Sequence, residues 1–200
     1  MNGNLWDFTE PKTDSMLTVN FKPFPVLSTD HLTLMQVSQQ DVNEIFFLRS
    51  DKRVLQFLGK ASAKSTEEAF LFIKKINELE NNNDGITWGI KLKEEEKLIG
   101  TICYWNITKE HYRAELGYAL HPDYHGKGIM QEALSEVIKY GFTTMKLHSV
   151  EAKVDPRNIS SIKLLERNNF IREGFFKEDY FYDGNFLDTA VYSLITAGNW

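Results

Sequence analysis

Gly126 and Gly128 frame the part of the sequence best suited to hold a phosphorylated ligand. They flank Lys127 and stand at the start of a long amphipathic stretch, residues 128–145. Glycine adopts positive φ angles and lets a phosphate approach the backbone, and the first N–H groups of a helix have no internal partner. The spacing therefore predicts a diphosphate cradle made by the amides of residues 126–130, with Lys127 beside it. A glycine-rich connector that binds nothing is the alternative interpretation.

Other ligand-binding motifs do not fit the sequence. A P-loop needs Ser or Thr after its Lys, but Gly128 follows Lys127, and a dinucleotide fingerprint needs a third glycine where Gln131 stands. The single cysteine, Cys103, excludes an intrachain disulfide, and its strand-like surroundings favour a core residue over a nucleophile. We expect no metal, because suitably spaced ligands do not converge among the histidines, which include His121, His125 and His148.

The composition narrows the class of protein further. The chain has 200 residues, of which 42% are hydrophobic and 26% charged, so we expect one folded domain with a modest extension. The formal net charge of −5 argues against a nucleic-acid partner, and no run approaches the roughly 18 apolar residues of a membrane span. Charged residues stand where a signal peptide needs an apolar core, so a cytoplasmic location is expected.

Hydrophobic periodicity predicts a mixed α/β domain. Alternation predicts strands at residues 31–37, 86–92, 98–105, 112–120, 150–154, 175–182 and 186–195, and a period near 3.6 predicts helices at residues 38–50, 54–58, 65–80, 128–145 and 160–168. The last two strands should form a hairpin around Asp183 and Gly184. The strand–helix–strand unit at residues 112–154 should have parallel strands joined in a right-handed sense.

Residues 1–25 form an irregular N-terminal arm interrupted by prolines. Trp6, Phe8 and Phe21 predict that this arm packs on something. Its own domain and a partner subunit are equal alternatives, and the second would make the protein a homodimer.

Three segments, taken in order, resemble the motifs of one enzyme family, the GNAT N-acetyltransferases. Residues 117–122 (Gly-Tyr-Ala-Leu-His-Pro) and 124–133 resemble its acetyl-CoA motif, and residues 158–170 resemble its second motif. Residues 183–188, followed by Tyr192, are similar to the closing hairpin of the branch that acetylates N-termini of ribosomal proteins. The resemblance spans residues 26–195 and implies a GNAT-like domain at 26–200. Its fold would be a mostly antiparallel mixed sheet, flanked by helices, with a central parallel strand pair splayed at the acetyl-CoA site.

The resemblance also implies which residues hold acetyl-CoA as the cosubstrate. The pantetheine arm would pair with the strand backbone at residues 118–120 like an added strand, and a local bulge there would open a slot against residues 150–154. Two residues at the start of the second-motif helix would face the same arm. The implied binding residues are Tyr118, Ala119, Leu120, His125, Gly126, Lys127, Gly128, Ile129, Met130, Asn158 and Ser161.

The sequence departs from the family pattern at several positions. His125 replaces the usual Gln or Arg at the start of the loop, and Met130 replaces a small residue. Asn169 stands where the family has the glycine of a Gly-Phe pair, although Asn tolerates left-handed angles. Leu165 occupies the place of a tyrosine general acid, which excludes a tyrosine acid at that position.

Two residues are the candidates for catalysis itself. Glu115 is the expected general base, acting through a water, with an exposed strand carboxylate paired with Arg113 or a neighbour as the alternative. Ser161 is expected to hydrogen-bond near the sulfur of the thioester. Tyr118 and Tyr192 are further candidate proton donors or, alternatively, aromatic core residues.

These observations predict an acetyl-CoA-dependent N-acetyltransferase that moves the acetyl group directly to a primary amine, with a protein N-terminal α-amine as the first choice. A small amine (an amino acid, polyamine or aminoglycoside) is the alternative acceptor. A CoA-binding module without catalysis is the alternative class, supported by Leu165 and His125. The acceptor pocket should lie between residues 42–58 and the final hairpin. Its candidate lining is Phe46, Phe47, Arg49, Trp88, Tyr104 and Trp105, and plain core is the alternative that such spacings of aromatic residues favour.

Overall fold

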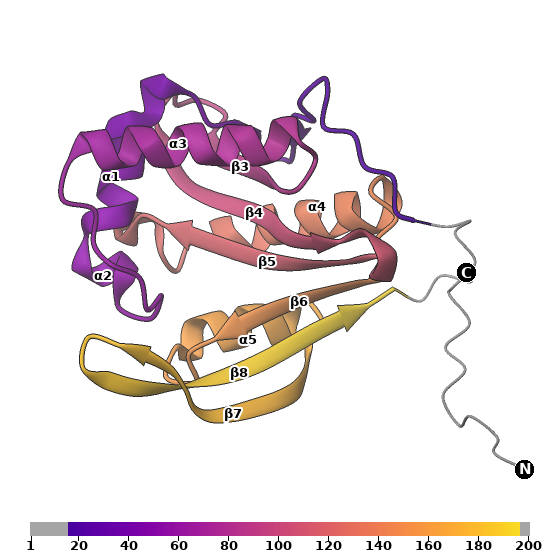
Figure 1. Ribbon diagram of the computed structural model, residues 1–200. Helices are drawn as coiled ribbons and strands as arrows, with labels where there is room; N and C mark the ends of the chain where they lie inside the picture. Colours follow the sequence, from indigo (N-terminus) through magenta and orange to yellow (C-terminus); the bar gives the residue numbers. More distant parts are fainter. Residues whose placement is uncertain (1–15, 197–200) are drawn as a thin grey trace, which may run out of the picture.

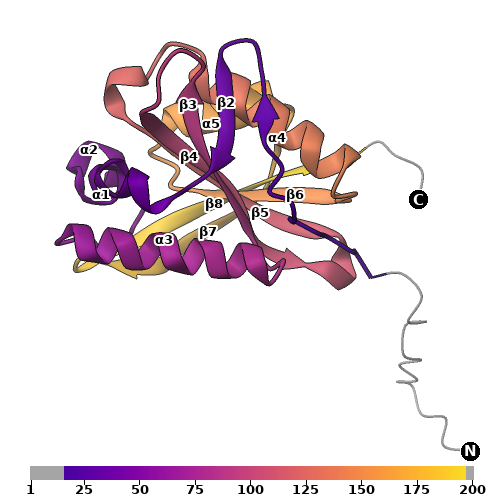
Figure 2. The same ribbon diagram turned by 90° about the horizontal axis from the view of Figure 1, so that it is seen from above.

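The computed structural model describes residues 16–196 and contains an eight-stranded sheet with helices on both faces (Figure 1). The strand order is β1-β2-β3-β4-β5-β6-β8-β7, and β5–β6 is its parallel pair. Figure 2 shows α1, α2 and α3 on one face of the sheet and α4 and α5 on the other. This is the mixed, mostly antiparallel architecture that the sequence predicts.

The elements have the following bounds. The strands are β1 (Leu27–Ser28), β2 (Leu32–Gln36), β3 (Ile86–Leu92), β4 (Leu98–Thr108), β5 (Arg113–Leu120), β6 (Ser149–Val154), β7 (Ile171–Tyr182) and β8 (Asn185–Ile195). The α-helices are α1 (Val42–Ser50), α2 (Lys52–Leu55), α3 (Thr66–Asn81), α4 (Ile129–Thr143) and α5 (Ile159–Arg167). The short 3₁₀ helices are η1 (Gln39–Asp41), η2 (Lys109–His111) and η3 (Pro122–Tyr124).

Capping residues explain why the helices begin where they do. Ser38 caps η1, and Asp41 completes a capping box with it, so the predicted helix at residues 38–50 is divided into η1 and α1. Ser65 caps α3 by accepting a hydrogen bond from the Glu68 amide. Strand β1 was not predicted, because two residues are too short for any alternation to show.

The larger core lies between the sheet and α4. Trp88 packs edge-on against Tyr104 and Tyr140, with ring centroids 6.2 Å and 5.4 Å away. The Tyr104 hydroxyl donates to the Val137 carbonyl at 3.0 Å. Trp88 and Tyr104 are both fully buried, so the prediction that they line the acceptor pocket is wrong; their large apolar surfaces are used to join β3 and β4 to α4.

The described part of the N-terminal arm packs on its own domain. Leu17, Val19 and Phe21 are buried in the same core as the sheet. The Phe21 amide donates to Asn83 Oδ1 at 2.9 Å. Trp6 and Phe8 lie outside the described residues, so the homodimer stays a prediction.

Strands β5 and β6 diverge, and this divergence positions the site. They pair from Arg113 opposite Ser149 to Glu115 opposite Glu151, and no further. Beyond Glu115, β5 stays paired with β4 while β6 pairs with β8, so a wedge opens between them (Figure 1). The bulge expected at residues 118–120 is absent there: the β4–β5 register shifts instead after Trp105, where Asn106 has φ 46°.

Across residues 16–196, no helix has the length and apolar character needed to cross a membrane.

Candidate active site

The loop ahead of α4 presents unobstructed backbone amides. Gly126 and Gly128 have φ angles of 73° and 79°, the left-handed region that favours glycine. A Cβ at either position would meet no atom within 4 Å, and no side chain caps the first turn of α4. The first N–H groups of α4, including those of Ile129 and Met130, therefore have no side-chain cap, as the predicted diphosphate cradle requires.

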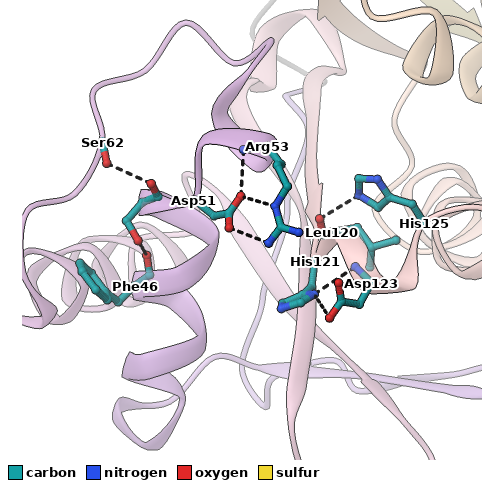
Figure 3. A network of polar contacts seen from close by, with 9 residues as sticks. Phe46, Asp51, Arg53, Ser62, Leu120, His121, Asp123 and His125 are labelled. Carbon is teal, nitrogen blue, oxygen red and sulfur yellow. Dashed lines mark hydrogen bonds and ion pairs between the residues drawn. The ribbon is translucent and has the colours of Figure 1, made fainter.

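A hydrogen bond of the His125 side chain links this loop to the end of β5. Its Nε2 atom lies 3.0 Å from the Leu120 carbonyl oxygen, as Figure 3 shows, and in the tautomer that carries a proton on Nε2 the ring donates to that oxygen. One carbonyl of the predicted pantetheine-binding strand is thus already engaged by the chain itself. The exposed Lys127 ammonium lies 5.3 Å from the Tyr124 ring centroid, beside the loop.

Tyr118 and Ser161 face each other across the wedge. Their hydroxyl oxygens are 2.6 Å apart, and Ser161 is 8% exposed. Burial raises the pKa of Tyr118 to about 12, and the hydrogen bond with Ser161 opposes this only in part. Asn158 caps α5 by accepting a hydrogen bond from the Ser161 amide at 3.1 Å, so its structural role is the one expected of an N-cap.

Glu115 lies where β5 and β6 separate. Its side chain is buried, with the residue 5% exposed, and the Asn106 amide donates to it at 3.1 Å. The Lys153 ammonium lies 3.3 Å from the same carboxylate. Burial by itself lowers the pKa of Lys153, but the facing carboxylates of Glu115 and Glu151 raise it overall.

Of the alternative interpretation of Glu115, the pairing with a neighbour is present, since Lys153 lies beside it, but the pairing with Arg113 and the exposed position are not. Arg113 instead donates to the carboxylate of Glu151 at 2.6 Å and to the hydroxyls of Ser149 and Ser193. Cys103 also stays outside the chemistry, because burial raises the pKa of its thiol to about 11 and keeps it protonated near neutral pH.

Two tyrosines of β7 hydrogen-bond to the loop after α2, on the side of the wedge where the acceptor is expected. The sequence did not predict these contacts. The Tyr180 hydroxyl donates to the Gly59 carbonyl and the Tyr182 hydroxyl donates to that of Lys60 at 2.8 Å, which ties β7 to the loop after α2. The Lys60 ammonium lies 5.5 Å from the ring centroid of Trp105, which is 39% exposed. The feature of the sequence that could have indicated these contacts is the alternation of Tyr180 and Tyr182 beside the predicted hairpin turn.

The remaining predicted lining residues have other partners. Phe47 stacks on His121, with centroids 4.1 Å apart, and the Arg49 guanidinium covers the Phe72 ring at 4.0 Å. His121 also accepts a hydrogen bond from the Asp123 amide (Figure 3).

Tyr192, the other candidate proton donor, is a buried residue of β8. No group of three or more His, Cys, Asp or Glu side chains within residues 16–196 could hold a metal ion.

A splayed parallel strand pair next to a helix whose first turn is open to a diphosphate defines a CoA-dependent acyltransferase site. Residues 31–171 match the model of the acetyltransferase (GNAT) domain, and the chain belongs to this family.

Two similar proteins agree with this membership, and a third shares the fold. The uncharacterized N-acetyltransferase YoaA of Bacillus subtilis is 35% identical over 86% of this chain and 97% of its own. The crystal structure of ribosomal-protein-S5-alanine acetyltransferase from Vibrio fischeri has a TM-score of 0.78 and 28% identity, over 86% of this chain and 97% of its own. Spermidine N-acetyltransferase from Vibrio cholerae, in complex with CoA and spermine, shares the fold, with a TM-score of 0.75 and 22% identity over 84% of this chain and 96% of its own.

The protein is therefore an N-acetyltransferase with acetyl-CoA as cosubstrate. The alternative of a CoA-binding module without catalysis is not supported.

Proposed function

We propose that the protein transfers the acetyl group of acetyl-CoA directly to the α-amine of a protein N-terminus. The observation that carries the proposal is the position of Glu115: a buried carboxylate stands at the apex of the wedge, on the strand whose next residues, Tyr118 to Leu120, are expected to hold the pantetheine arm. Acetyl-CoA supplies the thioester carbon that the amine attacks.

Glu115 acts as the base in this proposal, through one water. An α-amine has a pKa of about 8, so a large share is already neutral near pH 7.5 and modest help suffices, whereas lysine at about 10.4 needs more. Lys153 and Asn106 hold the Glu115 carboxylate in place and satisfy it.

Tyr118 and Ser161 stabilise the departing thiolate by hydrogen bonding. A thiol has a pKa of about 8.5, more than three units below the value of about 12 for Tyr118, so full proton transfer from the phenol is unfavourable. A hydrogen bond aimed at the developing charge requires no such transfer. The proton that the thiolate finally takes comes from the amine or from solvent.

The charges on the acceptor side support an N-terminal peptide over a polyamine. The Lys60 ammonium lies over Trp105, so a cation already borders the approach to the base. A polyamine carries several positive charges and would be repelled there. The likeness to ribosomal-protein-S5-alanine acetyltransferase points the same way. A small amine with few charges is the second candidate.

The other assignments stay predictions: acetyl-CoA contacts by the backbone of Tyr118, Ala119 and Leu120 and by Asn158, and a cytoplasmic location.

The proposal is tested by incubating the protein with a cell extract and isotopically labelled acetyl-CoA, followed by mass spectrometry of peptides and small molecules. We expect label on peptide N-termini, absent when Glu115→Gln replaces the native protein at equal concentration. Label confined to lysine side chains or to small amines would refute the N-terminal assignment.

A further inference from the structure

A second groove, of about 440 Å³, lies between α1, α3 and the loop that joins α2 to α3. Its lining is Arg49, Lys60, Glu68, Leu71, Phe72 and Lys75. Three cations and one carboxylate give it a positive charge, although the chain as a whole carries −5. Such a local excess of cations attracts an anion.

Arg49 is the most constrained of these cations. It is half-buried, and the central carbon of its guanidinium lies over the Phe72 ring, 4.0 Å from the ring centroid. Among residues 16–196 no side chain or carbonyl hydrogen-bonds to that guanidinium. Burial lowers the pKa of Arg49, and the Glu68 carboxylate opposes this lowering. The guanidinium is therefore partly desolvated without a hydrogen-bond partner among the described residues to compensate. A fixed fork of donors of this kind matches a carboxylate or a phosphate.

Glu68 does not neutralise the groove. Its Oε2 atom accepts a hydrogen bond from the Lys64 amide at 3.0 Å, where it helps to cap α3. Lys75 lies two turns further along the same helix and contributes an exposed ammonium. The lining therefore keeps three cations against one carboxylate.

Lys60 connects this groove to the site of acetyl transfer. It lines the groove, and its ammonium lies 5.5 Å from the Trp105 ring. Trp105 is paired with Glu115 across the β4–β5 ladder. A molecule whose amine is at Glu115 would thus extend past Trp105 and Lys60 toward Arg49.

We infer that this groove binds an oxyanion, a carboxylate or a phosphate, carried by the acceptor molecule. The inference rests on the proposed function, since it deepens the choice of acceptor for the same site. In a protein substrate the oxyanion is an acidic side chain among the first residues, and in a small amine it is a phosphate on the same molecule.

The test compares two matched pairs of acceptors. The first pair consists of hexapeptides that begin with Ala and carry either Glu or Gln at positions two to four. The second pair is phosphoethanolamine and ethanolamine. With the full-length protein, kcat/KM for the anionic member should exceed that for its neutral partner by about tenfold in one of the pairs.

The variants Arg49→Gln and Lys75→Gln should bring this ratio toward one, mostly through KM. Lys74→Gln is the matched control, because Lys74 is on the same helix but contacts Phe70 outside the groove. Lys75 is exposed, so Lys75→Gln keeps the test valid if Arg49→Gln destabilises the fold. Thermal unfolding of each variant identifies such a loss.

The outcomes separate the two proposals. Ratios near one in both pairs, or a ratio unchanged in both groove variants, would overturn the oxyanion site, while N-terminal acetylation of the peptides would still stand. An Arg49-dependent preference for phosphoethanolamine without any peptide turnover would support the oxyanion site and refute the N-terminal assignment.

Discussion

The hydroxyl oxygens of Tyr118 on β5 and Ser161 on α5 are 2.6 Å apart, in the region where β5 and β6 no longer pair. This hydrogen bond spans the wedge, so the two hydroxyls are positioned together. Both are buried or nearly so, which makes their dipoles stronger than they would be in water. The two hydroxyls therefore act together in stabilising the thiolate.

Replacing Tyr118 by Phe or Ser161 by Ala should lower kcat by about tenfold each, and the double variant should lose little more than either single one. Because the pKa of Tyr118 is raised to about 12, the phenol stays neutral between pH 6 and 9. The Tyr118→Phe profile of rate against pH should therefore keep its shape at a lower height. Steady-state measurement of thiol release checks both statements, with Tyr140→Phe as a core control.

Fully additive losses would show that the two hydroxyls act separately. A shifted midpoint in the pH profile of Tyr118→Phe would show that the phenol ionises during turnover.

Glu115→Gln should lower kcat/KM most strongly at pH 6 to 7 and less at pH 9. The reason is that a peptide α-amine, with a pKa of about 8, is already deprotonated at pH 9 and needs no base. We expect a deficit of about a hundredfold at pH 7 that shrinks to about tenfold at pH 9. Asn106→Ala is the comparison, because it removes a hydrogen bond to Glu115 and leaves the carboxylate.

A deficit for Glu115→Gln that is constant from pH 6 to 9 would assign Glu115 to structure alone.

Gly128→Ala should weaken acetyl-CoA binding by at least about tenfold in calorimetry. An alanine at φ 79° costs about 1 to 2 kcal/mol of stability, and its methyl group would occupy the space expected for the diphosphate. Gly184→Ala is a matched control, because Gly184 has φ 77° in the hairpin turn and open surroundings. Both variants should lose similar stability, and only Gly128→Ala should lose affinity.

Equal affinity in these two variants would remove residues 126–130 from the acetyl-CoA site.

Local signals predicted much of the fold. Strand β3 has its predicted bounds, and α3 begins directly after the Ser65 cap, because alternation and capping are encoded within a few neighbouring residues. The parallel β5–β6 pair followed from connection rules that apply to any strand–helix–strand unit.

Contacts between distant segments could not be predicted in the same way. Lys153 beside Glu115, Ser161 beside Tyr118 and Tyr182 beside Lys60 join residues 38, 43 and 122 positions apart. Trp88 and Tyr104 were candidates for the pocket lining for the same reason. Aromatic residues suit either a pocket or a core, and only the packing against α4 shows that these two belong to the core.

Gly141→Ala should destabilise the protein by about 1 to 3 kcal/mol, although the same change stabilises most helix interiors by about 1 kcal/mol. The sign reverses because a Cβ at this position of α4 would lie 2.5 Å from the Tyr104 hydroxyl oxygen. Tyr104 is fully buried and bonded to Val137, so it has no free space to enter. Chemical unfolding measures the loss.

A double-mutant cycle with Tyr104→Phe tests the cause. Removing the hydroxyl takes away the atom nearest to the new methyl group, so Gly141→Ala should cost less in the Tyr104→Phe background than in the native one. The same cost in both backgrounds would show that the helix, and not the Tyr104 contact, requires glycine. A stabilising Gly141→Ala would mean that α4 packs further from β4 than the structure shows.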